Sequence, residues 1–178
     1  MRTFGWRILP LFLFIALGLF FLRGLSLDPQ YLPSAKIGKP LPNFNLPLLF
    51  DADKRMTPDS LKKKVALLNV WASWCAACIE EQVFMLKLSR EGVPIYGINY
   101  KDKAENARRW LANWGNPYEI VAQDKDGKLA IDLGVYGAPE TFLVDKEGII
   151  QYRHVGILTE EDWKKDILPR MRQLERVS

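Results

Sequence analysis

Residues 65–82 read VALLNVWASWCAACIEEQ and hold the only two cysteines of this 178-residue chain, Cys75 and Cys78. The near-continuous apolar run at residues 65–72 is typical of a strand buried on both faces of a sheet. Residues 75–90 have the spacing of an amphipathic helix. The sequence therefore places both cysteines where a buried strand passes into a helix.

Strand-like and helix-like segments alternate along the rest of the chain. Strands are expected at residues 44–49, 65–72, 93–100, 118–123, 140–145 and 149–154. Helices are expected at residues 75–90, with Ile79, Val83 and Leu86 on one face, and at residues 103–114 and 159–168. Pro169 should kink or end the last helix, because proline has no backbone N–H. This order of elements predicts an α/β fold with a mixed central sheet flanked by helices.

The net charge of +4 does not indicate a nucleic-acid-binding protein. Arg2, Arg7 and Arg23 supply three of these charges within residues 1–27, which contain no acidic residue. The rest of the chain therefore has a net charge of only +1, without the basic excess that binding to nucleic acid requires. We expect no nucleic-acid partner.

Residues 1–27 are expected to form a transmembrane signal anchor. Fifteen residues without a charge or a strongly polar group lie between Arg7 and Arg23, near the short limit for a spanning helix of about 20 residues. The alternatives are a cleaved signal peptide, although no A-x-A-like site is present, and a buried helix of a soluble fold. Arg2 and Arg7 would stay in the cytoplasm by the positive-inside tendency. Anchor and signal peptide both place the folded part outside the cytoplasm, where dithiols can be oxidised.

Residues 28–36 are expected to be an extended tether. Pro29 and Pro33 favour an extended backbone, and two further prolines follow at positions 40 and 42. The folded domain is therefore expected to comprise residues 37–176.

The C-x-x-C spacing is compatible with several kinds of site. Zinc needs four ligands, and besides the two cysteines the chain offers one histidine, His154. Covalent haem attachment needs a histidine directly after the second cysteine, where Ile79 stands. A purely structural disulfide would close a tiny loop and add little stability. A redox-active dithiol is therefore favoured, and neither a metal nor a cofactor is expected.

The helix N-terminus assigns different roles to the two thiols. Its unpaired N–H groups and partial positive charge favour a thiolate. Cys75, at the start of the helix, would be the exposed nucleophile. Cys78 lies one turn later on the same face, close enough to bridge, and would be the sheltered thiol that resolves the mixed disulfide.

Three motifs carry a resemblance to a known family. WASWCAAC at residues 71–78, GINYKD at residues 97–102 and GVYGAPETFLVD at residues 134–145 resemble the membrane-anchored thioredoxin-like reductases of cytochrome c maturation, the DsbE/CcmG type. The resemblance covers roughly residues 36–175. It implies a thioredoxin-like fold with an N-terminal membrane anchor.

The resemblance also implies roles for residues around the dithiol. Pro139 would follow a cis peptide bond, which leaves the backbone groups of Ala138 free to pair with an extended substrate. Glu81 and Glu140 match acidic positions near the dithiol, where a carboxylate opposes thiolate formation and can exchange a proton. Glu81 is expected to be catalytic, and Glu140 is expected at the substrate-binding surface together with Ala138 and Pro139. Trp74, beside the first cysteine, is expected to shield the dithiol and contribute to the substrate-binding surface.

Two departures from the family pattern concern the dithiol itself. Ala76 and Ala77 stand between the cysteines, where the family usually has a proline. Gln82 replaces a neighbour that is frequently basic. A reduction potential therefore does not carry over from the family to this chain.

The function implied by the resemblance is that of a thiol:disulfide oxidoreductase. It would be a single-pass protein of a bacterial inner membrane with its catalytic domain in the periplasm. It would take electrons from a membrane thiol carrier and reduce a disulfide of apocytochrome c or of a maturation thiol protein. The alternatives are a thioredoxin-like oxidant or thiol peroxidase, and a cytochrome assembly factor without redox turnover.

Overall fold

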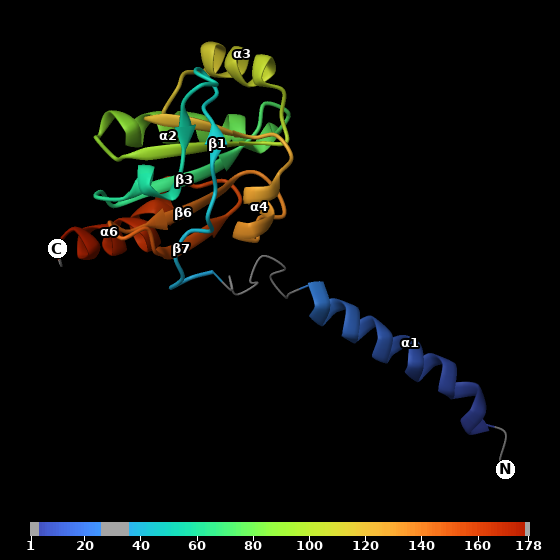
Figure 1. Ribbon diagram of the computed structural model, residues 1–178. Coiled ribbons are helices and arrows are strands. Elements are labelled where there is room, and N and C mark those ends of the chain that lie inside the picture. The colour runs from blue at the N-terminus through green and yellow to red at the C-terminus, as the bar shows by residue number, and fades with distance from the viewer. Residues whose placement is uncertain (1–3, 26–35, 177–178) are drawn as a thin grey trace. The chain divides into compact units, whose positions relative to one another are not determined.

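The computed structural model describes residues 4–25 and 36–176, which fall into two units, residues 1–33 and residues 34–178 (Figure 1). The first unit contains one helix, α1 (Phe4–Leu25). Within the described parts of the chain, no helix meets the length and hydropathy of a membrane span, so the expected anchor stays a prediction. The expected tether lies outside the described residues, except for Lys36.

A five-stranded mixed sheet forms the centre of the second unit, as the sequence predicts. Its strands are β3 (Ala66–Trp71), β4 (Ile95–Tyr100), β5 (Ile120–Asp124), β6 (Glu140–Val144) and β7 (Ile150–Val155). They lie in the order β5-β4-β3-β6-β7. β4 runs parallel to both β3 and β5, whereas β6 runs antiparallel to both β3 and β7. The central strand β3 leads directly into the cysteine pair.

Each face of the sheet is covered by a separate hydrophobic core, because side chains alternate along a strand. Leu67 and Trp71 of β3 pack on one face, together with side chains of α2 (Ala76–Arg90), α3 (Ala104–Trp114) and the C-terminal helices. Leu68 and Val70 pack on the other face, which α4 (Lys128–Leu133) covers. This two-sided burial explains the unbroken apolar run of β3.

The buried face of α2 is partly polar. Val83 is 76 % exposed, and Ile79 and Leu86 are only partly buried. The buried residues of α2 are instead Cys78, Glu81, Gln82, Met85 and Leu88. Because two polar residues lie on the buried face, the face shared by Ile79, Val83 and Leu86 is not the one that α2 buries most fully.

Several short elements were not expected from the sequence. They are β2 (Arg55–Met56), the 3₁₀ turn η1 (Pro58–Leu61) and α4. The first expected strand is reduced to β1 (Leu46–Pro47), which pairs with β2. Elements of two to six residues are too short to display a hydrophobic period.

The C-terminal helix changes its winding where Pro169 was expected to interrupt it. Thr159 caps α5 (Glu160–Asp162), a π-helical turn follows at Trp163–Ile167, and α6 spans Leu168–Arg176. Pro169 is the second residue of α6 and has no N–H to donate into the preceding turn. A new helical segment therefore starts next to Pro169, as expected, but the chain does not leave the helical conformation there.

Candidate active site

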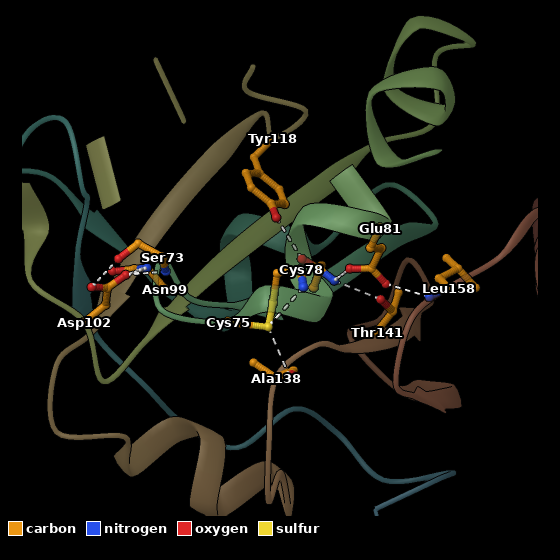
Figure 2. The surroundings of a disulfide bond; sticks show 11 residues. Ser73, Cys75, Cys78, Glu81, Asn99, Asp102, Tyr118, Ala138, Thr141 and Leu158 are labelled. Atoms are coloured by element: carbon orange, nitrogen blue, oxygen red, sulfur yellow. Dashed lines mark hydrogen bonds between the residues drawn. A yellow bond between two sulfur atoms is a disulfide. The ribbon is translucent and has the colours of Figure 1, made fainter. Parts of the chain in front are cut away.

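The two cysteines lie at the N-terminus of α2 and form a disulfide (Figure 2). Cys75 is the N-cap residue, and its Sγ accepts a 3.1 Å hydrogen bond from the backbone N–H of Cys78. The residues are 5 % and 2 % exposed, respectively. The expectation of an exposed first cysteine is therefore wrong for the oxidised protein, because the loop before Pro139 covers it.

The peptide bond between Ala138 and Pro139 is cis, as expected. This bond brings the chain against the dithiol, and the carbonyl oxygen of Ala138 lies 3.3 Å from Sγ of Cys75 (Figure 2). A disulfide sulfur has no proton to donate, so this is a packing contact here. After reduction, the Cys75 thiol can donate a hydrogen bond to the same oxygen.

Glu81 is buried one turn after Cys78, with 2 % of its surface exposed. Its Oε2 accepts a 3.0 Å hydrogen bond from Nδ2 of Asn69, and its Oε1 accepts a 2.8 Å bond from the backbone N–H of Leu158. Burial raises the pKa of Glu81 to about 7, although both hydrogen bonds oppose the rise. Residues three apart lie on the same helix face, so the structure places this carboxyl group on the side of α2 that carries Cys78.

Asn69 on β3 connects Glu81 to two further buried side chains. Its Nδ2 also donates to Oγ1 of Thr141, at 3.0 Å, and its Oδ1 accepts a 2.8 Å bond from the hydroxyl of Tyr118. Burial and the charge of Glu81 hold the pKa of Tyr118 well above its usual value. Gly97 lies directly beneath the Tyr118 ring, where a Cβ would approach ring carbons to 2.9 Å. Sequence reasoning missed this network, although Asn69 is the one polar residue of β3.

A second polar cluster holds the turn before the cysteines. The carboxylate of Asp102 accepts hydrogen bonds from the N–H and hydroxyl of Ser73, at 2.7 and 2.8 Å. It also accepts bonds from Nδ2 of Asn99 and the backbone N–H of Lys103. Figure 2 shows this cluster on the side of Cys75 away from Glu81. Asp102 belongs to the GINYKD motif, but the sequence alone did not indicate a role for it.

Trp74 lies on the surface beside the dithiol and is 56 % exposed. Its indole N–H donates a 3.1 Å hydrogen bond to the carbonyl oxygen of Lys101, and its ring lies 6.2 Å from that of Tyr100. The indole is thus anchored at its polar edge and presents much of its ring to solvent.

Glu140 does not act as a free acid beside the dithiol. It is 1 % exposed and forms a 2.6 Å ion pair with Arg153, whose Nε also donates to Oε2 at 2.7 Å. Burial raises the pKa of Glu140, and the guanidinium opposes this rise. The carboxylate is thus paired within the protein, and the expected part of Glu140 in substrate binding stays a prediction.

The two departures from the family pattern fit the helix without disturbing it. α2 begins at Ala76, and alanine is the residue most compatible with a helix. Gln82 is 2 % exposed and donates a 2.7 Å hydrogen bond from Nε2 to the carbonyl oxygen of Gly115. Gln82 therefore connects α2 to the end of α3.

Comparison with known proteins agrees with this geometry. Residues 36–167 match the Redoxin family. The thiol:disulfide interchange protein DsbE of Pseudomonas aeruginosa is 48 % identical over 167 residues, which cover 94 % of this chain and 93 % of that protein. This chain belongs to the DsbE family. DsbE of Escherichia coli K12 is 45 % identical over 168 residues, covering 91 % of each chain.

A solved structure supports the thioredoxin-like fold. The thio-disulfide isomerase of Thermus thermophilus is 30 % identical, with a TM-score of 0.61, and the match covers 76 % of this chain and 96 % of that one. Membership of the DsbE family identifies the chain as a thiol:disulfide oxidoreductase.

The Cys75–Cys78 disulfide fits thiol:disulfide exchange. In the order of attack expected from the sequence, the Cys75 thiolate would attack a substrate disulfide, and one substrate sulfur would leave as a thiolate. The Cys78 thiol would then lose its proton and attack Sγ of Cys75, which would release the second substrate sulfur. Two electrons and two protons would pass to the substrate, and the Cys75–Cys78 disulfide would remain.

Proposed function

We propose that the protein acts as a reductant in cytochrome c maturation. Its substrate would be a disulfide of apocytochrome c or of a maturation thiol protein. The observation that carries this proposal is the buried carboxyl group of Glu81 on the Cys78 side of α2. A carboxylate there opposes thiolate formation, which stabilises the disulfide relative to the dithiol. A dithiol that favours its own oxidised form is a reductant, whereas oxidants such as DsbA stabilise their reduced form.

The second candidate function is the oxidation of substrate dithiols, and one contact favours it. The backbone N–H of Cys78 donates to Sγ of Cys75 at the N-terminus of α2, which stabilises a Cys75 thiolate. This is a single hydrogen bond from a neutral donor. The Glu81 carboxylate, which forms as pH rises through about 7, acts in the opposite direction with a full charge in a buried site.

We infer that residues 1–27 attach the protein to a bacterial inner membrane, with the catalytic domain in the periplasm. α1 exposes large apolar side chains, including Leu13, Phe14 and Phe20, each at least 70 % exposed. Exposed apolar surface of this extent is suited to lipid rather than to water. Electrons would come from a membrane thiol carrier. Alkaline extraction of membranes tests the attachment, and release of the full-length chain into the soluble fraction would contradict it.

Trapping of the mixed disulfide tests the substrate class. The variant Cys78→Ser cannot resolve the intermediate, so it should accumulate a covalent complex with apocytochrome c or a maturation thiol protein. The complex should be visible on a non-reducing gel and lost with dithiothreitol. Cys75→Ser is the matched control and should trap far less, because Cys78 is the more buried thiol. If Cys78→Ser trapped only proteins unrelated to cytochrome c, the proposed substrate class would be wrong. If both variants trapped equally, the proposed roles of the two cysteines would be wrong.

A further inference from the structure

An exposed aromatic residue stands next to the loop that covers Cys75. Tyr136 is 57 % exposed and lies two residues before Ala138, whose carbonyl oxygen is 3.3 Å from the sulfur. Val135 beside it is buried in the core. The exposed Tyr136 ring is therefore carried by a residue two positions from the carbonyl group that contacts Cys75.

Arg153 on β7 fixes the position of this ring. Its guanidinium carbon lies 4.7 Å from the centroid of the Tyr136 ring, within the range of a cation–π contact. The same guanidinium donates to the carbonyl oxygen of Gly134, at 2.9 Å, and to Glu140. Arg153 therefore holds both the beginning of the loop and its aromatic side chain.

Glu140 completes this arrangement from β6. Its Oε1 accepts a 3.2 Å hydrogen bond from the backbone N–H of Tyr136, while its Oε2 binds Arg153. The side chains of this ion pair are only 1 % and 5 % exposed. Because the opposite charges are paired within the protein, they offer no free charge to a ligand. What remains for a partner is the exposed part of the Tyr136 ring.

We propose that Tyr136 is a specificity-determining residue that stacks on a planar side chain next to the attacked cysteine of the substrate, with Arg153 and Glu140 as positioning residues. A planar side chain is an aromatic ring or an imidazole. Trp74, directly before Cys75 in the sequence, presents a second exposed ring next to the dithiol. The inference rests on one part of the proposed function, the reduction of a peptide disulfide by the dithiol. The preference for a planar side chain should also hold when the protein oxidises a peptide dithiol.

The test compares three disulfide-closed peptides, Cys-Ala-Ala-Cys-X, in which X is histidine, phenylalanine or leucine. Pre-reduced full-length protein supplies both electrons and both thiol protons, and the rate of a single turnover is followed against peptide concentration. The histidine and phenylalanine peptides should reach half-maximal rate at concentrations roughly 2- to 10-fold below the leucine peptide, the range for one stacked pair. Equal half-saturation for all three would overturn the inference and leave the reductant role standing.

Substitutions test the Tyr136 ring separately from Arg153, which positions it. Tyr136→Leu should lose the preference, and Tyr136→Phe should keep it, because the ring and not the hydroxyl makes the contact. Arg153→Lys keeps the charge beside Glu140 but removes the planar group. It should reduce the difference in half-saturating concentration between the peptides and leave their maximal rates unchanged. Trp114→Leu, which removes a ring 49 % exposed on α3, is the matched control and should keep the preference. A preference that survives in Tyr136→Leu would refute the assignment.

The reverse reaction keeps the two proposals distinguishable. Oxidised protein is mixed with the three reduced peptides, and their oxidation is followed in the same way. A ring preference in this direction, combined with poor reduction of all three disulfides, would support the role of Tyr136 and contradict the reductant role.

Discussion

The carboxylate of Glu81 accepts a 3.0 Å hydrogen bond from the side-chain amide of Asn69. The backbone N–H of Leu158 occupies its other oxygen. Neither donor carries a positive charge, so burial dominates and raises the pKa of Glu81 to about 7. A carboxyl group of this kind can accept or return a proton near neutral pH, which is what the second thiol requires when it resolves a mixed disulfide.

Glu81→Gln should slow the resolution step and flatten its pH dependence. In the unchanged protein, the rate of attack by Cys78 should rise as pH increases through about 7, because Glu81 then becomes available as a base. Without the carboxylate the rate should fall by roughly 10²-fold, the lower end for the loss of a general base. Stopped-flow release of a chromophoric substrate thiol measures this step. Glu80→Gln, at the exposed neighbouring position, is the control; equal rates in both variants would refute the role.

The same carboxyl group should make the folded domain less stable as pH rises. Its pKa is raised in the folded state from 4.5 to about 7. Between these values the unfolded chain has released a proton that the folded protein still holds, so the free energy of unfolding falls with increasing pH. The loss should approach about 3 kcal/mol and level off above pH 7. Urea denaturation from pH 4.5 to 8 should show this loss in the unchanged protein but not in Glu81→Gln. If the free energy of unfolding depended on pH in the same way in both proteins, the raised pKa of Glu81 would be contradicted.

Asn69→Ala should destabilise the domain and disturb Glu81. The substitution leaves the Tyr118 hydroxyl and one oxygen of Glu81 without their partner in a buried site. The expected loss is roughly 2–3 kcal/mol in the free energy of unfolding, and the pKa of Glu81 should rise further because a stabilising donor is lost. Asn106→Ala, at an exposed position of α3, should change neither quantity. A stable Asn69→Ala with an unchanged pH profile would contradict the network.

Asp102→Ala should loosen the turn that carries Trp74 and Cys75. Four donors lose their acceptor, including the N–H and hydroxyl of Ser73. We expect a loss of roughly 2–4 kcal/mol in the free energy of unfolding, and faster amide exchange at Ser73 and Trp74. Asp126→Ala, in an exposed turn, is the matched control. Unchanged exchange at Ser73 would show that Asp102 does not hold the turn.

The elements that position the dithiol could be predicted from the sequence. β3 and α2 have clear patterns, since the strand is apolar on both faces and the helix starts directly at the cysteines. The β6–β7 hairpin was also expected, from two apolar segments around residues 146–148. The cis bond before Pro139 required the family resemblance, because a proline at the start of a strand is ordinary by itself.

The buried polar contacts could not be predicted in the same way. Asn69 is the single polar residue of an apolar strand. Its partners, Thr141 on β6 and Tyr118 just before β5, are distant from it in the sequence. Glu140 lies within the motif that carries the resemblance, but its pairing depends on Arg153, which is brought close to it by the register of β6 with β7. Such contacts are set by tertiary structure, and a lone sequence contains no pattern that specifies them.

The reduction potential of the Cys75–Cys78 couple tests the proposed function most directly. It is measured by equilibrating the protein with defined ratios of reduced and oxidised dithiothreitol or glutathione, and quantifying the fraction of disulfide. If Glu81 disfavours the thiolates, the potential should lie near that of thioredoxin, about −270 mV. A potential near that of the oxidant DsbA, about −120 mV, would contradict the account and make the protein a donor of disulfides.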